Sequence, residues 1–246
     1  MFTLIEFFLI FFALVSWCIY SIFVLFNLRK TLTVFLYCGL FFHFAWIVYR
    51  TVLVTHAPFS NAYESILFFS FLYFLKISFS KYWTQKRKAI LILPAEILLI
   101  IGLLLPETMK IPNFLVPALQ SFWMFIHVPS FFIGYTSLTY LFVLCLLEFF
   151  LKKDFSLIIK SELKQSFFFI TLGIITGGFW ADQCWASFWN WDPKEIWALV
   201  TFILLTAAFH CESKKIKYIF IYLSFFAMLF TYFGVMFLLS GLHSYK

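Results

Sequence analysis

Long apolar runs separated by short polar joints recur along almost the whole chain. The first run, residues 2–26, is too long for a signal-peptide core and lacks the charged start and the small-residue cleavage site of one. Hydrophobic residues make up 64% of the chain and charged residues 12%, whereas a soluble domain carries about a quarter charged residues. A core of this size cannot hide so much apolar surface from water. The sequence therefore predicts an all-α integral membrane protein.

The apolar runs divide into eight expected helical spans, each close to the roughly 20 residues that a bilayer requires. We expect them at residues 3–26, 31–49, 62–78, 89–105, 123–149, 167–183, 195–211 and 218–240. None of the joints is rich enough in Pro, Gly or Ser to be an interdomain linker, and the sequence has no internal repeat. We therefore expect one polytopic domain over residues 1–246, folded as a single bundle of about eight transmembrane helices.

Lysine and arginine are concentrated in alternate joints of this pattern. Most of the 18 basic residues fall at 29–30, 76–88, 152–164 and 214–217. Basic joints stay on the cytoplasmic side of a membrane protein, so both termini and the stretch 178–195 are expected outside. The net charge of +7 is explained by these joints, and we expect no nucleic-acid partner.

The stretch 178–195, GFWADQCWASFWNWDPKE, is unusually rich in tryptophan. Its four indoles fall within twelve residues, at Trp180, Trp185, Trp189 and Trp191. Tryptophan is enriched at membrane interfaces, which is one interpretation of the stretch. The alternative is a platform for a flat aromatic ligand, since a belt needs only one or two indoles per span. The residues alone leave both interpretations open.

The polar end of this stretch has the pattern of a helix start. Asp192 is placed as the N-cap, Pro193 as the first helical residue and Glu195 as the third. A similar pattern opens the expected span at 62, where Asn61 stands as N-cap and Glu64 at the capping-box position. Capping explains all three carboxylates without any further role.

Two histidines are expected at the same outer depth as the tryptophans. Counting about 20 residues outward from the inner lysines at 152 and 217 puts His127 and His243 near the outer boundary. Two imidazoles and four indoles at one depth suit a flat, metal-centred ligand such as haem, with the histidines as axial ligands.

The remaining histidines are less specific. His210 is expected near the inner surface, whereas His43 lies within the second span, as a ligand or as a neutral hydrogen-bonding residue between helices. His56 is interpreted as a solvated loop residue. The five cysteines are scattered singly, so the sequence has neither a Cys-x-x-Cys pair nor the Cys-x-x-Cys-His motif of covalent haem attachment.

Taken in order, these segments resemble a known family. The stretch 180–195 resembles the tryptophan-rich WWD signature of haem-handling proteins. With residues 58–65 (PFSNAYES), His127 and residues 241–245 (GLHSY), it is similar to the CcsA (ResC) branch of system II cytochrome c biogenesis. The four segments span residues 58–245. Ala181 and Ala186 depart from the pattern, because the family often has glycine at both positions.

The resemblance implies a function, a cofactor and partners. CcsA-like proteins act with a CcsB (ResB) partner, bring haem b across the membrane without a covalent bond, and present it outside to apocytochrome c carrying Cys-x-x-Cys-His. Thiol-reducing proteins take part indirectly. The location it implies is a bacterial inner membrane or a plastid thylakoid membrane. We expect a subunit of a cytochrome c synthase complex rather than a stand-alone enzyme.

The resemblance also implies roles for particular residues. His127 and His243 match the external axial ligands of haem iron, and His210 matches a ligand of an inner haem whose second ligand comes from the partner. The platform residues are Trp180, Trp185, Trp189, Trp191 and Asp192, and the supporting residues are Asn61, Glu64 and Glu195. Two other functions stay open: delivery of haem to a separate chaperone, as in CcmC proteins, and transport of another solute.

Overall fold

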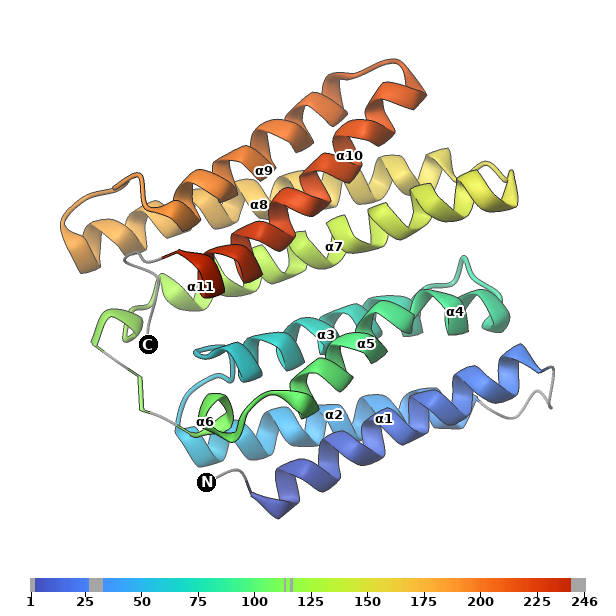
Figure 1. Cartoon of the computed structure of the whole chain (residues 1–246), viewed down its shortest axis with the longest axis horizontal. Helices are drawn as coiled ribbons and strands as arrows, with labels where there is room; N and C mark the ends of the chain where they lie inside the picture. Colours follow the sequence, from blue (N-terminus) through green and yellow to red (C-terminus); the bar gives the residue numbers. More distant parts are fainter. Residues whose placement is uncertain (1–2, 27–32, 113, 116, 240–246) are drawn as a thin grey trace. The chain divides into compact units, whose positions relative to one another are not determined.

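All the regular secondary structure in the part of the chain that the structure describes is helical, with no strand there (Figure 1). The computed structural model describes residues 3–26, 33–112, 114–115 and 117–239. Its helices in chain order are α1 (Leu4–Leu25), α2 (Thr33–Val54), α3 (Ala62–Phe79), α4 (Gln85–Leu91), α5 (Leu93–Leu104), α6 (Glu107–Lys110), the 3-10 turn η2 (Pro117–Leu119), α7 (Met124–Leu151), α8 (Ser156–Trp185), α9 (Pro193–His210), α10 (Lys214–Leu229), the π-helical η3 (Phe230–Gly234) and α11 (Val235–Leu238). The predicted all-α class is confirmed.

Six of these helices are long and apolar enough to cross a membrane: α1, α2, α3, α7, α8, and α10 continued through η3. The expected span 89–105 corresponds to two shorter helices, α4 and α5, which meet at Ile92. The expected span 195–211 corresponds to α9, which is not among the six. The chain is a multi-pass membrane protein, whereas a total of eight spans and external termini stay predictions.

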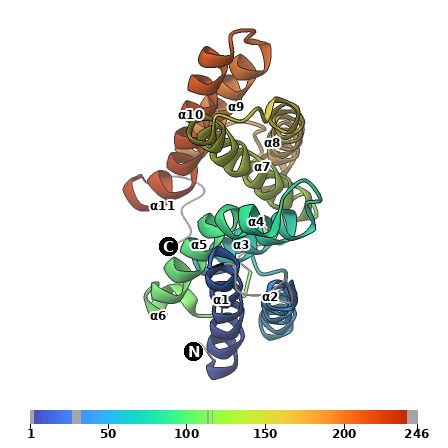
Figure 2. The ribbon, with the colours of Figure 1, turned by 90° about the vertical axis from the view of Figure 1, so that its right-hand side faces the viewer.

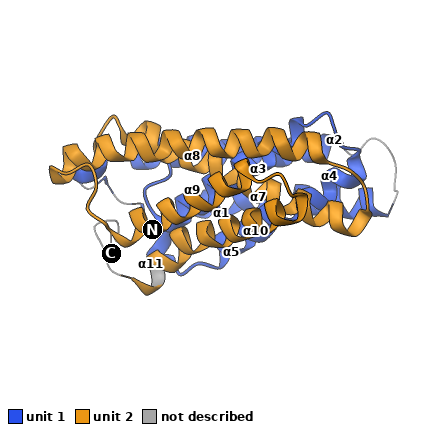
Figure 3. Cartoon of the chain, turned by 90° about the horizontal axis from the view of Figure 1, so that it is seen from above, with its two compact units in different colours: residues 1–119 blue, residues 120–246 orange. Residues whose placement is uncertain are grey.

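The chain divides into two compact units, Met1–Leu119 and Gln120–Lys246 (Figure 3). In the first unit, α1 packs against α2, α4 and α5, and α3 packs against α2, α5 and α6 (Figure 2). Its core is aromatic: the indole of Trp17 stacks on the ring of Phe74 and donates from Nε1 to the Leu36 carbonyl at 3.1 Å. That α1–α2 contact requires Gly39, because a Cβ there would lie 2.5 Å from the indole.

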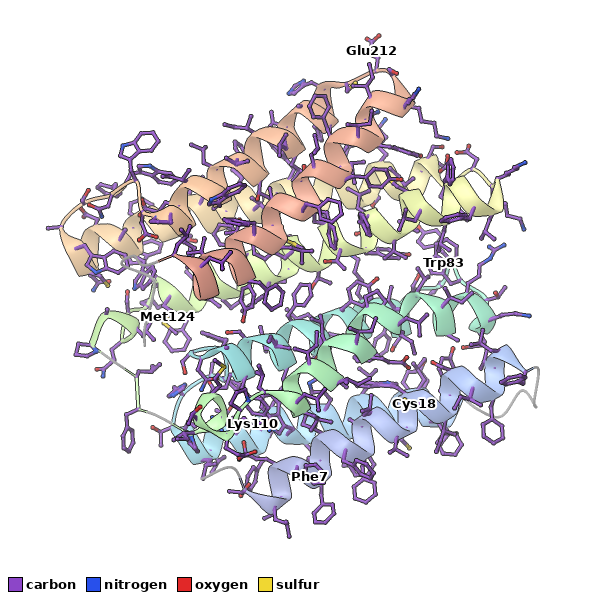
Figure 4. The ribbon with its side chains drawn as sticks, viewed as in Figure 1. Phe7, Cys18, Trp83, Lys110, Met124 and Glu212 are labelled. Carbon is purple, nitrogen blue, oxygen red and sulfur yellow. The ribbon has the colours of Figure 1, made fainter. Side chains whose placement is uncertain are left out.

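The second unit contains α7 to α11. The helices α7, α8, α9 and α10 run in alternating directions, with α7 packed on α8, α9 on α10, and α10 also on α7. Met124 marks the start of α7, and Glu212 marks the turn between α9 and α10 at the opposite end (Figure 4). This topology brings the start of α7, the end of α8 and the start of α9 to one end of the unit.

The long α8 begins earlier than the sequence suggested. It starts at Ser156, so Lys160 and Lys164, which we expected in a joint, lie on its first turns. Near this end, Glu148 of α7 accepts a hydrogen bond from the backbone of Phe155 at 2.9 Å and pairs with Lys214 of α10. The basic end of the unit is thus tied together by one buried carboxylate.

Candidate functional site

His127 lies on the second turn of α7, where α7 faces α8. Its Nδ1 is 2.8 Å from the carbonyl oxygen of Gly173. A carbonyl oxygen can only accept, so Nδ1 carries the proton and the lone pair of the neutral ring is on Nε2. The imidazole stacks on Trp180 of α8, with centroids 5.5 Å apart and planes at 30°, and meets the ring of Phe131 edge-on. Its orientation is fixed from two sides.

Two glycines on α8 make room for this arrangement. A Cβ at Gly177 would lie 2.6 Å from both Cε1 and Nδ1 of His127, and a Cβ at Gly173 would lie 2.7 Å from the ring of Phe131. Residues four apart lie on the same helix face, so the two glycines form one shallow step on α8 that receives side chains from α7. Larger residues there would displace the imidazole.

The four tryptophans form two edge-to-face pairs rather than one flat platform. Trp180 and Trp185, at the end of α8, have centroids 5.0 Å apart and planes at 64°. Trp189 and Trp191, in the following loop, are 6.0 Å apart with planes at 87°. Trp180 is buried beside His127, whereas Trp191 is 67% exposed. The two pairs therefore differ in what they can contact. The pair Trp180 and Trp185 supports His127, whereas the pair Trp189 and Trp191 exposes an indole ring at the surface.

The loop between α8 and α9 begins and ends at residues in the left-handed backbone region. Ala186 has φ 54° and Trp191 has φ 55°. This conformation costs a non-glycine residue roughly 1–2 kcal/mol. α8 ends at Trp185, so Trp189 lies in the loop and does not share a helix face with Trp185.

The predicted start of the next helix is confirmed. Asp192 is the buried N-cap of α9 and forms a capping box with Glu195, and Pro193 is the first helical residue. The Asp192 carboxylate accepts from the backbone of Lys194 at 3.0 Å. Its observed contacts are those of a helix cap.

Replacing Ala186 with glycine is expected to stabilise the protein by about 1 kcal/mol. Relief of roughly 1–2 kcal/mol of left-handed strain exceeds the roughly 0.4–1 kcal/mol of extra chain entropy that glycine loses on folding. The melting temperature of the detergent-solubilised protein should rise by about 2–4 °C. Ala181→Gly is the matched control, because Ala181 is buried inside α8, where glycine destabilises by about 1 kcal/mol. Equal shifts in the two variants would contradict the strain argument.

The other predicted histidines lie at the far end of α9, in the first unit, or outside the described residues. His243 is outside them. His210 is exposed at the far end of α9, beside Phe209. His43 is fully buried in the first unit, against the rings of Trp17 and Trp46. His56 is buried rather than solvated, with Nδ1 2.9 Å from the carbonyl oxygen of Ala57, which corrects our interpretation of it.

The supporting pair Asn61 and Glu64 lies in the first unit, at the start of α3. Asn61 caps α3 as predicted and accepts from the Glu64 amide at 2.9 Å. The Glu64 side chain does not complete a capping box, however. One oxygen accepts from the backbone and hydroxyl of Ser60 at 3.0 and 2.8 Å, and the other pairs with Arg50 Nε at 2.9 Å. Capping is therefore only part of the role of this segment.

Arg50 connects four elements of the first unit. Its Nη1 pairs with Glu6 of α1 at 2.8 Å, and its Nη2 donates to the carbonyl of Lys110 on α6 at 3.0 Å. All three charged side chains, Glu6, Arg50 and Glu64, are completely buried. Sequence reasoning missed this triad because the expected second span ended at residue 49, which left Arg50 in a joint. The available signal was one basic and two acidic residues, Arg50 with Glu6 and Glu64, at the expected outer ends of three adjacent apolar runs.

Contacts between the segment just before α7 and the last turns of α8 were also not predicted. The hydroxyl of Ser121 donates to Gln183 at 2.6 Å, and the indole of Trp123 stacks on Phe179 with centroids 4.7 Å apart. Phe179 in turn meets Phe188 of the loop edge-on. These contacts fix the end of α8, and with it the position of the tryptophan loop relative to His127.

The fold and the site define a multi-pass membrane protein with an aromatic, histidine-bearing end. The sequence matches the family described as Cytochrome C assembly protein over residues 59–243. It is also similar to the cytochrome c biogenesis protein CcsA of Heterosigma akashiwo, with 30% identity over 84% of this chain and 81% of that protein. The chain belongs to the CcsA family and acts in cytochrome c maturation, which implies haem and apocytochrome c as the molecules handled.

Relatives occur in both bacteria and algae. CcsA of Chlamydomonas reinhardtii is 34% identical over 77% of this chain and 61% of its own length, and CcsA of Prochlorococcus marinus is 28% identical over 81% and 78%. Among solved structures, the protein titled Cytochrome c Heme Lyase CcmF matches with a TM-score of 0.68 at 17% identity. That match covers 94% of this chain but 46% of the CcmF chain, and it shows a shared fold.

Proposed function

We propose that this protein holds haem b non-covalently at the tryptophan-rich end of its second unit and presents it for attachment to apocytochrome c. The observation that carries the proposal is the hydrogen bond from His127 Nδ1 to the Gly173 carbonyl. Histidines that bind metals characteristically donate their other ring nitrogen to a carbonyl or a carboxylate, which fixes the tautomer and the ring direction. His127 and its surroundings thus suit the role of an axial ligand of haem iron.

His243 is proposed as the second external axial ligand. Two histidines would fill both axial positions of the iron, which restricts access of other ligands to it. Trp180 and Trp185 would buttress His127, and Trp189 and Trp191 would contact the porphyrin. Asp192 and Glu195 would act through the loop that carries these indoles, since their carboxylates bind backbone amides there.

The chemistry proposed for this end is carbon–sulfur bond formation. Haem supplies two vinyl groups, and each thiol of an incoming Cys-x-x-Cys-His segment adds across one of them, forming a carbon–sulfur bond and placing the thiol hydrogen on the neighbouring carbon. The residues of this chain hold and orient the reactants, so acceleration would come mainly from proximity. A CcsB (ResB)-like partner is proposed to complete the synthase.

A second haem position is proposed at the opposite end of α9. His210 is the last residue of that helix, and its exposed ring stands beside the stacked rings of Phe209 and Phe167. One histidine provides one axial ligand, and the partner subunit would provide the other. Haem would be received here, near the inner surface, before it reaches the external end.

Replacing His127 with alanine is expected to remove bound haem from the external site. The test is the absorption spectrum of the protein purified with its CcsB-like partner, recorded for the parent, His127→Ala and His243→Ala. Added imidazole should restore the bis-histidine spectrum in both variants, because it supplies the missing ligand. His56→Ala is the control, since its ring contacts the Ala57 carbonyl in the first unit. Unchanged spectra in both ligand variants would exclude the proposal.

Delivery of haem to a separate chaperone is the alternative within the same class. The experiment that distinguishes this alternative from direct presentation asks whether this chain and a CcsB-like partner alone produce covalent cytochrome c in cells that lack other assembly proteins. Covalent product supports direct presentation, whereas bound haem without product would favour delivery to a chaperone. A transporter of another solute predicts neither bound haem nor product.

A further inference from the structure

The carboxylate of Glu195 does more than cap α9. Its Oε2 accepts a hydrogen bond from the amide of Asp192 at 3.1 Å and a second from the amide of Asn190 at 2.8 Å. Only the first belongs to the capping box. The second reaches back across Trp191 into the loop, so one oxygen bridges the two amides on either side of that residue.

Trp191 is the residue enclosed by this bridge. Its φ of 55° lies in the left-handed region, which bulky residues adopt only when their surroundings impose it. Backbone amides around a left-handed residue converge to form an anion-binding concavity, and here the anion is the side chain of Glu195. The bridge therefore supplies the constraint that holds Trp191 in its unusual conformation.

The conformation has a consequence for the indole. Trp191 is 67% exposed, whereas Asp192, the next residue, is 5% exposed and caps α9. Among the described residues, the ring of Trp191 contacts the ring of Trp189 edge-to-face, and the backbone conformation at residue 191 sets where the indole starts from. A relaxed backbone at this residue would turn the indole elsewhere.

We propose that Glu195 is a positioning residue of the haem platform: it holds Trp191 in the left-handed conformation and thereby presents the indole to a flat aromatic ligand. The inference rests on the proposed function for the identity of that ligand, but the positioning of Trp191 can be tested without haem. It predicts that Glu195 acts through Trp191 and not only through the stability of α9.

The first measurement follows Trp191 directly. Protein labelled with 5-fluorotryptophan is studied by ¹⁹F NMR without haem, and the Trp191 resonance is assigned by its loss in Trp191→Phe. Glu195→Met removes the acceptor at similar side-chain length, so the Trp191 resonance should shift or broaden. Glu195→Gln keeps an acceptor oxygen and should retain the parent resonance. An unmoved Trp191 resonance in Glu195→Met would overturn the inference, whether or not the protein binds haem.

The second measurement separates positioning from capping. In the parent background, Glu195→Met should weaken haem retention by about 2- to 10-fold, the size of one aromatic stacking contribution. In a Trp191→Gly background the residue adopts positive φ without help, so Glu195→Met should cause no further loss. Equal losses in both backgrounds would mean that Glu195 only caps α9. A parent that binds no haem would contradict the proposed function and leave the NMR result to decide the inference.

Discussion

Gly177→Ala is expected to weaken haem binding about 10- to 100-fold, the usual cost of disturbing the support of a metal-ligating histidine. The added Cβ would lie 2.6 Å from two atoms of the His127 ring, so the imidazole must rotate or α7 must move away from α8. Either movement breaks the 2.8 Å hydrogen bond between Nδ1 and the Gly173 carbonyl. The measurement is haem titration of the purified protein, followed by absorbance.

Gly178→Ala is the matched control for this variant. It makes the same substitution one residue later on the same helix, but among the described residues its Cβ would meet Phe188 alone, at ordinary contact distances of 3.5 and 3.6 Å. Haem affinity should be unchanged, and helix stability should increase slightly because alanine is the better helix former. If the two variants bind haem equally well, the fit between Gly177 and His127 does not position the ligand.

The helices were predictable because each apolar run is long and each joint is polar. Their ends were less predictable, for an identifiable reason. A span predicted from bilayer thickness is ended at the first charged residue. The helix α8 nevertheless begins at Ser156, before Lys160 and Lys164. Lysine is a good helix former, so a helix can continue beyond the apolar region. In the same way α2 continues past Arg50 to Val54, because the charge is paired inside the unit.

The parts of the site that were predictable are those carried by local sequence. The cap at Asp192 and the capping box with Glu195 depend on residues within four positions of each other, and the structure contains both. The support of His127 depends instead on how α7 is aligned with α8, which brings residue 127 to Gly173 and Gly177. No short-range pattern specifies that alignment, so neither glycine stood out. The haem roles of the histidines and tryptophans stay proposals.

Arg50→Met is expected to destabilise the protein by about 3–5 kcal/mol, because removing one member of a buried ion cluster leaves its partners uncompensated. Glu6 and Glu64 are both fully buried and bind the guanidinium at 2.8 and 2.9 Å. Without it, two carboxylates would remain in the interior, where the described residues give them hydrogen bonds from the backbone amides and hydroxyls of residues 3 and 60. The arginine joins α1, α2, α3 and α6, so the effect should reach the whole first unit.

The comparison that tests this account is a triple variant, Glu6→Gln with Arg50→Met and Glu64→Gln. Replacing all members of a buried ion cluster is often close to neutral, because the desolvation cost disappears with the charges. Thermal melting in detergent should therefore give a loss of roughly 6–20 °C for Arg50→Met and a much smaller loss for the triple variant. A triple variant as unstable as Arg50→Met would mean that the shape of the arginine, and not its charge, holds these helix ends together. A stable Arg50→Met would mean that the triad contributes little to folding.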